Sequence, residues 1–258
     1  MVSFTSTELY AWVASFLWPL TRILGLIAAA PLFGNLSVPV RVKIVLGVMI
    51  ALVIAPGVPE GPAMDPMSLA GLAIVAQQVV IGLAMGFAMR VVLSASEMAG
   101  EITGLTMGFG FATFFDPQTR ARTSVLAQFL SLLMLMIFLA LNAHLLMLSA
   151  LAHSFVTMPI AAEPMGSAGF REIALWGGVI FSAGVQLALP MIAVLLLTNI
   201  ALGILTRAAP QLNLFGIGFP VTVGVGFLVV ALVLPFLATP MSRLLEDALG
   251  FIRRISGG

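Results

Sequence analysis

The sequence predicts an all-α protein of the integral membrane type, built from long, kinked helical hairpins. Of its 258 residues, 61% are hydrophobic and only 8% are charged, and the mean hydropathy is +1.17. Soluble domains carry about a quarter charged residues, so this chain belongs in or against a bilayer. Membrane barrels alternate in polarity at every second residue, and the long apolar runs here do not, which leaves helices as the expected element.

The sequence contains six apolar blocks that are separated by short, more polar segments. Most are long enough to cross a hydrocarbon core, which needs about 20 residues. The second block is short for a span unless it extends back through Val38. An amphipathic tail, Met241–Ile255, follows the last block and is suited to an interface. The blocks cover residues 9–33, 44–56, 69–93, 125–151, 173–202 and 214–238.

The basic residues give an inconsistent topology. Arg41 and Lys43 follow the first block, and more arginines surround the exit of the third. By the positive-inside rule this pattern places the N-terminus outside. Simple alternation then puts the arginines of the C-terminal tail on the exterior as well. Either a span is miscounted, or the helices do not all cross the bilayer in the usual way.

Polar residues and prolines interrupt the blocks. A polar side chain in such a run normally points toward protein or a water-filled path, so their density favours an assembly of several chains. For each of them a satisfied hydrogen bond between helices is the favoured interpretation, and a proton relay is the less favoured alternative, because no Asp or Glu lies deep in a block. Prolines inside helices predict kinks. The polar residues are Arg22, Gln77, Gln78, Gln128, Asn142, His144, Gln186 and Asn199, and the prolines are Pro19, Pro190 and Pro235.

The chain offers no pattern typical of an enzyme. It has no cysteine, which excludes thiolate metal sites and cysteine nucleophiles. His144 and His153 lack an acidic neighbour to complete a metal site. No phosphate-binding or nucleophile motif is present, and no run of basic residues suits nucleic acid. We therefore expect no catalytic residue, no cofactor and no metal.

The stretch MGFGFATFFDPQTRAR, residues 107–122, is the most irregular part of the chain. Bulky rings crowd between glycines on one side and Asp-Pro with two arginines on the other. Just before it, Glu97 and Glu101 share one helical face, where like charges repel. We expect either a cationic or aqueous partner for this pair, or simple solvation of both carboxylates.

Three ordered stretches resemble one family. They are RILGLIAAAPLFGNLSVPVRVKIVLG (residues 22–47), AGEITGLTMGFGFATFFDP (99–117) and LGILTRAAPQLNLFGIGFP (202–220). Together they look like FliR, the R subunit of the flagellar type III export gate, and the likeness extends over essentially the whole chain. One departure is Thr106, where family members often carry Gln.

The resemblance implies a non-enzymatic subunit of a protein export channel. Family members join P and Q subunits in a helical hetero-oligomeric assembly in the flagellar basal body at the bacterial inner membrane, extending toward the periplasmic side. The B subunit surrounds its entrance, and the A subunit belongs to the same apparatus. Cargo is unfolded rod, hook and filament protein. By this likeness residues 1–170 are similar to a P subunit and residues 171–258, a helical hairpin and the tail, to a Q subunit.

In a family that lines a protein-conducting pore, the segment near residues 104–122 is expected to act as a plug. Bulky rings would exclude water and ions by crowding and dewetting the constriction. Glycines would give the backbone the freedom to swing the plug aside. The alternative is ordinary helix packing around a kink. The plug residues would be Met107, Phe109, Phe111, Phe114 and Phe115, with hinges at Gly104, Gly108 and Gly110.

A second polar turn, near residues 206–220, is suited to meeting another subunit, with a solvated loop as the alternative. The candidate subunit contacts over the whole chain are Arg22, Glu97, Glu101, Arg207, Gln211 and Asn213. Membrane lipid is a further expected partner. The competing function is a self-contained secondary transporter or ion channel, which predicts an inverted repeat and a buried acidic coupling site. The sequence shows neither.

Overall fold

The computed structural model describes residues 6–59, 61–62, 64–111, 124–161, 166–209 and 218–256, and the side chains among them from residue 12 onward except that of residue 111. Helices make up almost all of this described part, and no strand occurs in it. The all-α prediction is confirmed. The elements are α1 (Ser6–Ala29), α2 (Val40–Ile54), η1 (Ala55–Gly57), α3 (Leu69–Met107), η2 (Phe109–Phe111), α5 (Val125–Ala140), α6 (Ala143–Thr157), α7 (Ser167–Gly177), α8 (Val179–Ala208) and α9 (Phe219–Ile255).

The chain forms two compact units that interleave along the sequence. Unit 1 comprises Met1–Val91, Asn142–Gly177 and Leu245–Gly258, and unit 2 comprises Val92–Leu141 and Gly178–Leu244. Helices α3 and α9 each contribute one part to unit 1 and the other part to unit 2. The division into P-like and Q-like parts near residue 170 concerns likeness to other proteins and stays a prediction.

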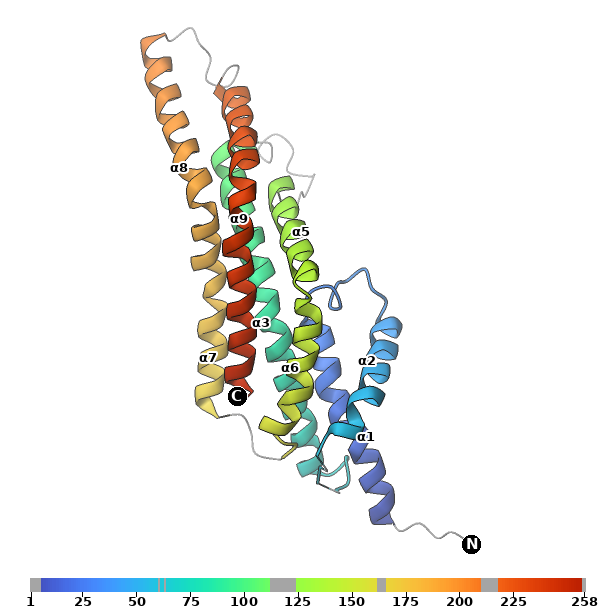
Figure 1. Cartoon of the computed structure of the whole chain (residues 1–258). Helices are drawn as coiled ribbons and strands as arrows, with labels where there is room; N and C mark the ends of the chain where they lie inside the picture. The colour runs from blue at the N-terminus through green and yellow to red at the C-terminus, as the bar shows by residue number, and fades with distance from the viewer. Residues whose placement is uncertain are drawn as a thin grey trace. The chain divides into compact units, whose positions relative to one another are not determined.

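In unit 1, α1 packs on α2 and on the first part of α3 (Figure 1). Gly82 and Gly86 of α3 lie against the α1 backbone, so closely that a Cβ at Gly86 would come within 2.7 Å of the Leu26 carbonyl oxygen. Small residues four apart permit this approach. Trp176 of α7 joins two further elements: its Nε1 donates to the Ala88 carbonyl at 3.1 Å, and its ring stacks on Phe251 of α9 at 4.6 Å.

In unit 2, the last part of α3 packs on α5, α8 and α9. Gly100 lies against the backbone of Ala127, where an added Cβ would collide with the α5 main chain. Gly184 of α8 meets the Met98 side chain in the same way. Thr103 is fully buried and lies 3.9 Å from the Met191 sulfur of α8. The core of this unit is therefore built around the end of α3.

Helix boundaries differ from the apolar blocks in several places. The block 125–151 is two helices, α5 and α6, because Asn142 between them takes a left-handed conformation with φ of 53°. The block 173–202 is likewise interrupted at Gly178, between α7 and α8. The third block continues as helix to Met107, far beyond residue 93. Exposed or half-buried polar residues end an apolar run without ending a helix.

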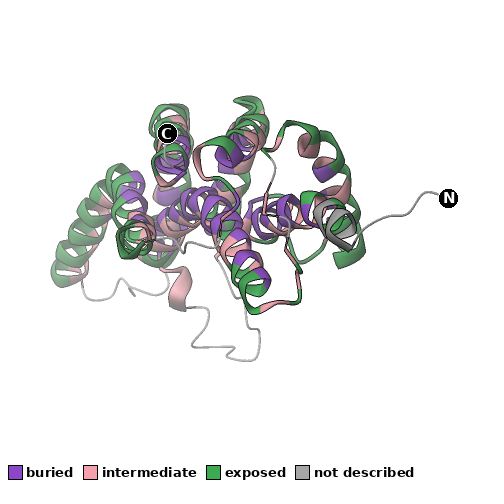
Figure 2. Cartoon of the chain, turned by 90° about the horizontal axis from the view of Figure 1, so that it is seen from below, coloured by how far each residue is buried: buried purple, intermediate pink, exposed green. Residues whose placement is uncertain are grey.

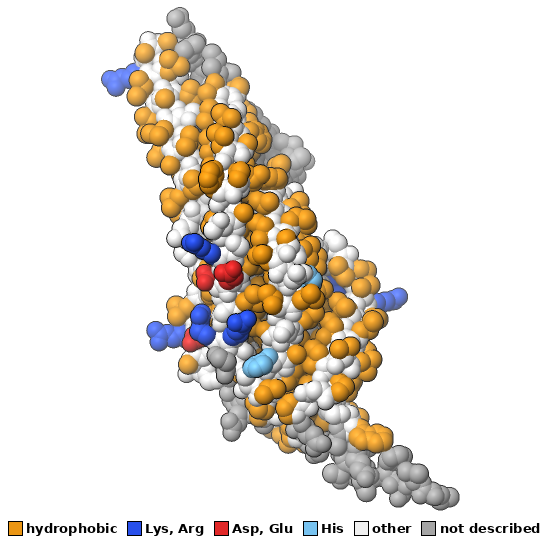
Figure 3. All heavy atoms as spheres, viewed as in Figure 1, with side chains coloured by type: hydrophobic (Ala, Val, Ile, Leu, Met, Phe, Trp, Pro, Cys, Tyr) orange, Lys and Arg blue, Asp and Glu red, His pale blue; other side chains and the backbone are white. Residues whose placement is uncertain are grey.

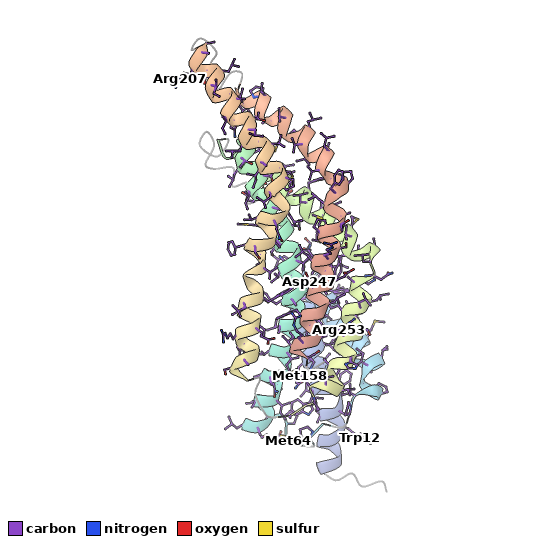
Figure 4. The ribbon with its side chains drawn as sticks, turned by 60° about the vertical axis from the view of Figure 1, so that its left-hand side comes forward. Trp12, Met64, Met158, Arg207, Asp247 and Arg253 are labelled. Atoms are coloured by element: carbon purple, nitrogen blue, oxygen red, sulfur yellow. The ribbon has the colours of Figure 1, made fainter. Side chains whose placement is uncertain are left out.

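The predicted amphipathic tail is the last part of α9 and not an element of its own. Leu245 and Ile252 on its apolar face are buried within the chain. Asp247 and Arg253, which Figure 4 labels on α9, are exposed. The tail's apolar face therefore has a partner inside the protein.

Within the described residues, five helical stretches are long and apolar enough to cross a membrane, or six if the α5–α6 pair is counted as one span. Buried residues line the sides of the helices that face one another (Figure 2), while hydrophobic side chains also cover much of the outer surface (Figure 3). On α8 alone Leu197 and Ile204 are each 67% exposed. A surface this apolar requires lipid or further protein, which agrees with the membrane prediction.

Candidate functional site

The predicted plug begins where α3 ends, and its first part is described by the structure. Met107 is the last residue of α3 and is fully buried. Phe109 opens the short helix η2, and its side chain is half-buried. The side chain of Phe111 lies outside the described residues, as do Phe114 and Phe115. We call residues 106–109 the α3 end.

The α3 end packs against α9 within unit 2. Met107 contacts Gly226, and the Phe109 ring lies 6.1 Å from the ring of Phe227 at a tilt of 53°. This is a distance and an orientation that aromatic pairs favour. The first ring of the predicted plug is therefore held against a helix rather than being free in solvent.

Of the three predicted hinge glycines, only Gly108 has a backbone that requires glycine. Its φ is 95°, and its N–H donates to the Leu105 carbonyl at 3.0 Å, which turns the chain out of α3. Such a φ is accessible to glycine without a steric cost. Gly104 is instead a packing position, since a Cβ there would lie 3.1 Å from Ser124 Oγ. Gly110 has a similar contact, with its Cβ position 3.2 Å from Leu105 Cδ2.

The chain returns from the undescribed residues 112–123 at Ser124, and this point is also fixed to α3. Glu101 Oε2 accepts a hydrogen bond from the Ser124 backbone N–H at 3.1 Å. Ser124 is the N-cap of α5, and its hydroxyl accepts from the Ala127 N–H at 3.1 Å. A helix N-terminus carries partial positive charge and favours a carboxylate. The positive partner of Glu101 is therefore this helix end, while Glu97 is half-buried on the preceding turn.

Arg22, a predicted subunit contact, is fully buried in unit 1. Its Nε donates to Gln78 Oε1 at 2.7 Å, and its two terminal nitrogens donate to the carbonyl of Ser154 at 2.8 Å and of Met158 at 2.9 Å. The guanidinium also lies 4.3 Å from the centroid of the Phe155 ring. These carbonyls belong to the C-terminal end of α6, where a cation is favoured. Arg22 thus caps α6 inside the chain, which leaves it out of the surface contacts.

The remaining subunit contact candidates lie at the end of α8. Arg207 is exposed in the last turn of that helix, at the tip labelled in Figure 4. Gln211 and Asn213 fall outside the described residues. Arg207 is therefore the only member of this group whose position supports the prediction of an available surface residue.

Comparison with known proteins shows the family to which the chain belongs. A family model described as bacterial export proteins, family 1, matches residues 13–248. The chain belongs to this family. The match runs from within α1 to within α9.

Individual relatives agree with this membership along nearly the full length. A flagellar biosynthetic protein FliR from Pectobacterium carotovorum subsp. carotovorum is 43% identical over 255 residues, which are 99% of this chain and 97% of the relative. The protein of the same name from Escherichia coli K12 is 41% identical with the same coverage. That from Bacillus subtilis 168 is 30% identical over 83% of each chain. The resemblance to the FliR family is thereby confirmed.

Sequence reasoning missed the residues of α8 and α9 that receive the α3 end. Asn199 was read only as a polar residue within a block, although its Nδ2 donates to the Thr106 carbonyl at 3.4 Å. Sequence analysis predicted no role for Gly226, which lies within an apolar run. Its only signal is its spacing of two from Gly224, and that pattern does not distinguish a packed glycine from an open one. The described residues include no group of three His, Cys, Asp or Glu that could hold a metal ion.

Proposed function

We propose that this chain is a subunit of the flagellar protein export apparatus. The observation that carries the proposal is the match to proteins named flagellar biosynthetic protein FliR over 99% of the chain. Its helices are long and apolar enough for a membrane location. The subunit has a structural role with no catalytic residue, and it sits at the bacterial inner membrane in the flagellar basal body.

The proposed partners are the P, Q, B and A subunits of the apparatus, and the proposed cargo is unfolded rod, hook and filament protein. The exposed apolar faces of α2 and α8 support this, because a helix with so little of its surface buried needs other chains or lipid around it. Arg207 at the tip of α8 is a candidate contact with a charged or amide group of another subunit.

Within the apparatus, we assign the α3 end and the residues that follow it to sealing the channel. Phe109 supports the assignment by its position: it follows a glycine of positive φ that turns the chain out of a long helix. Crowded rings dewet a constriction and so block ions while the channel is idle. Nothing in the described structure favours a self-contained transporter, whose coupling would need a buried acid; the buried polar or charged residues described are Arg22, Gln78, Ser96, Thr103, Ser154, Thr222 and Ser256.

The test replaces residues 109–115 with a Gly/Ser run of equal length in cells that carry the rest of the apparatus. We expect ion leak across the inner membrane to rise while the complex still assembles. The single variant Phe109→Ala should leak less than the full replacement. Phe129→Ala is the matched control, because Phe129 lies on α5 of the same unit and is 42% exposed. Loss of assembly without leak would mean that these rings are packing residues.

A further inference from the structure

Helix α9 has a notch at Gly226 that the last side chain of α3 fills. A Cβ added to Gly226 would lie 2.5 Å from Met107 Cε, 2.6 Å from its Cγ and 2.8 Å from its Sδ. Three atoms of one side chain surround this point, so the Met107 side chain cannot stay in place beside any larger residue. Met107 is fully buried there. Protein interiors are packed closely enough that even one methyl group is felt.

The contact continues on both sides of the turn at Gly108. Phe227, next to the notch, meets Phe109, as described above. Met107 and Phe109 flank Gly108, whose positive φ turns the chain between them. Consecutive residues of α9 therefore hold the residue before the turn and the residue after it.

A polar connection through α8 adds to this. Asn199 Nδ2 donates to the Thr106 carbonyl, and Asn199 Oδ1 accepts from Thr222 Oγ1 at 3.5 Å. Both bonds are long and individually weak. Thr222 precedes Gly226 by one helical turn and so lies on the same face of α9. The contacts described above thus join the α3 end to Gly226 and Phe227 of α9 and to Asn199 of α8.

We propose that Gly226 and Phe227 are positioning residues that form a latch for the seal. The latch seats Met107 and thereby fixes Phe109, so a displacement of α9 along or away from α3 unseats the first ring. This inference rests on the proposed function, since it assumes that Phe109 belongs to the seal. It assigns to the α8–α9 hairpin the control of a residue that belongs to another helix.

The leak experiment uses Gly226→Val in the full chain, in cells with the complete apparatus. Gly224→Val is the matched control, because nothing lies within 4 Å of a Cβ at Gly224 on the same helix. Valine at 226 displaces Met107, so we expect ion leak to rise while assembly is retained. Valine at 224 should leave both unchanged. Gly226→Ala, which adds a single methyl group, serves if the valine variant fails to assemble. Loss of assembly in both variants, or assembly without leak, would overturn the latch.

A second readout follows the contact directly. The chain has no cysteine, so Phe109→Cys with Phe227→Cys gives a single cysteine pair, and its joining by a short bifunctional maleimide is measured by the mobility of the chain on a gel. The cross-link yield should fall several-fold when Gly226→Val is added and stay unchanged with Gly224→Val. An unchanged yield with Gly226→Val would overturn the latch, because the position of Phe109 would then not depend on the packing of Met107 against Gly226.

The two readouts separate this inference from the proposed function. If the Gly/Ser replacement of residues 109–115 leaks but Gly226→Val lowers the cross-link yield without leak, the seal stands and the latch falls. If the Gly/Ser replacement does not leak, the seal itself falls, and a lowered cross-link yield then reports only a packing contact. Leak together with a lowered yield, in a complex that assembles normally, supports both.

Discussion

Replacement of Arg22 by methionine tests whether a buried guanidinium holds unit 1 together. Methionine keeps an unbranched apolar stem but removes the donors to Gln78 Oε1 and to the Met158 carbonyl. The Ser154 carbonyl keeps a partner, since it also accepts from the Met158 N–H at 2.9 Å. One buried acceptor, Gln78 Oε1, and one partly buried acceptor, the Met158 carbonyl, are therefore orphaned, and each costs about 1–3 kcal/mol.

The sum is about 2–6 kcal/mol, and part of it is recovered because a buried charge no longer has to be desolvated. We expect a net loss near 3 kcal/mol. For a chain of this size 1 kcal/mol corresponds to about 2–4 °C in Tm, so the variant should melt roughly 6–12 °C lower. The assay is thermal unfolding in detergent, followed by tryptophan fluorescence. Trp18 lies one helical turn from Arg22 and is fully buried, which makes it a local reporter.

Arg22→Lys distinguishes charge from geometry. Lysine keeps the charge but lacks the planar fork that reaches Gln78 and the end of α6 together. We expect it to recover less than half of the loss. Arg90→Met is the matched control, because Arg90 is an exposed arginine of the same unit, and its Tm should move by little. A lysine variant that melts like the unmodified protein would refute the geometric argument, and a stable methionine variant would refute the cap itself.

Three further changes test the packing of each unit, all read as Tm in the same assay. Gly82→Ala places a methyl group against the α1 backbone and should destabilise by about 1–3 kcal/mol; a neutral result would mean that the two helices separate at little cost. Trp176→Phe keeps a ring for stacking but loses the donor to the Ala88 carbonyl, which should lower the free energy of unfolding by about 1 kcal/mol. An unchanged Tm would show that this hydrogen bond does not contribute to stability. Ser124→Ala removes the cap that accepts from the Ala127 N–H and should cost about 1 kcal/mol, whereas Ser124→Asp should retain most of the stability.

Composition and block length were sufficient to predict the fold class, because lipid leaves a helix as the only single-chain solution for an apolar run. The helix ends were harder to predict. The third block ends at residue 93 by hydropathy, but α3 continues to Met107 because its polar residues lie where neighbouring helices or solvent satisfy them. Asn142 ends the helix within a continuous apolar run by its φ of 53°, and the local sequence pattern does not predict this break. Backbone conformation at single residues is invisible to hydropathy.

The candidate site was predicted in part. Rings and glycines after a helix drew attention to the α3 end, and the positive φ of Gly108 agrees with a turn there. The partner helix could not be predicted, since Gly226 lies more than a hundred residues later in a run of apolar residues. Arg22 was named as a candidate subunit contact, although a satisfied hydrogen bond between helices was the favoured interpretation of polar residues in these runs. Its guanidinium donates to acceptor atoms of Gln78 in α3 and of Ser154 and Met158 at the end of α6. Pairing of distant residues is a property of the fold and not of any window of sequence.

Helix α3 has 39 residues, which at 1.5 Å per residue makes it about 58 Å long. A hydrocarbon core is about 30 Å thick, so it accommodates roughly half of this rod. Exposed Arg90 lies near the middle of α3 and marks a level that hydrocarbon should not cover. We expect one half of α3 to lie outside the lipid, where its exposed apolar side chains contact neighbouring protein chains. Many of the apolar residues that mark this sequence as a membrane protein would then be covered by other protein chains rather than by lipid.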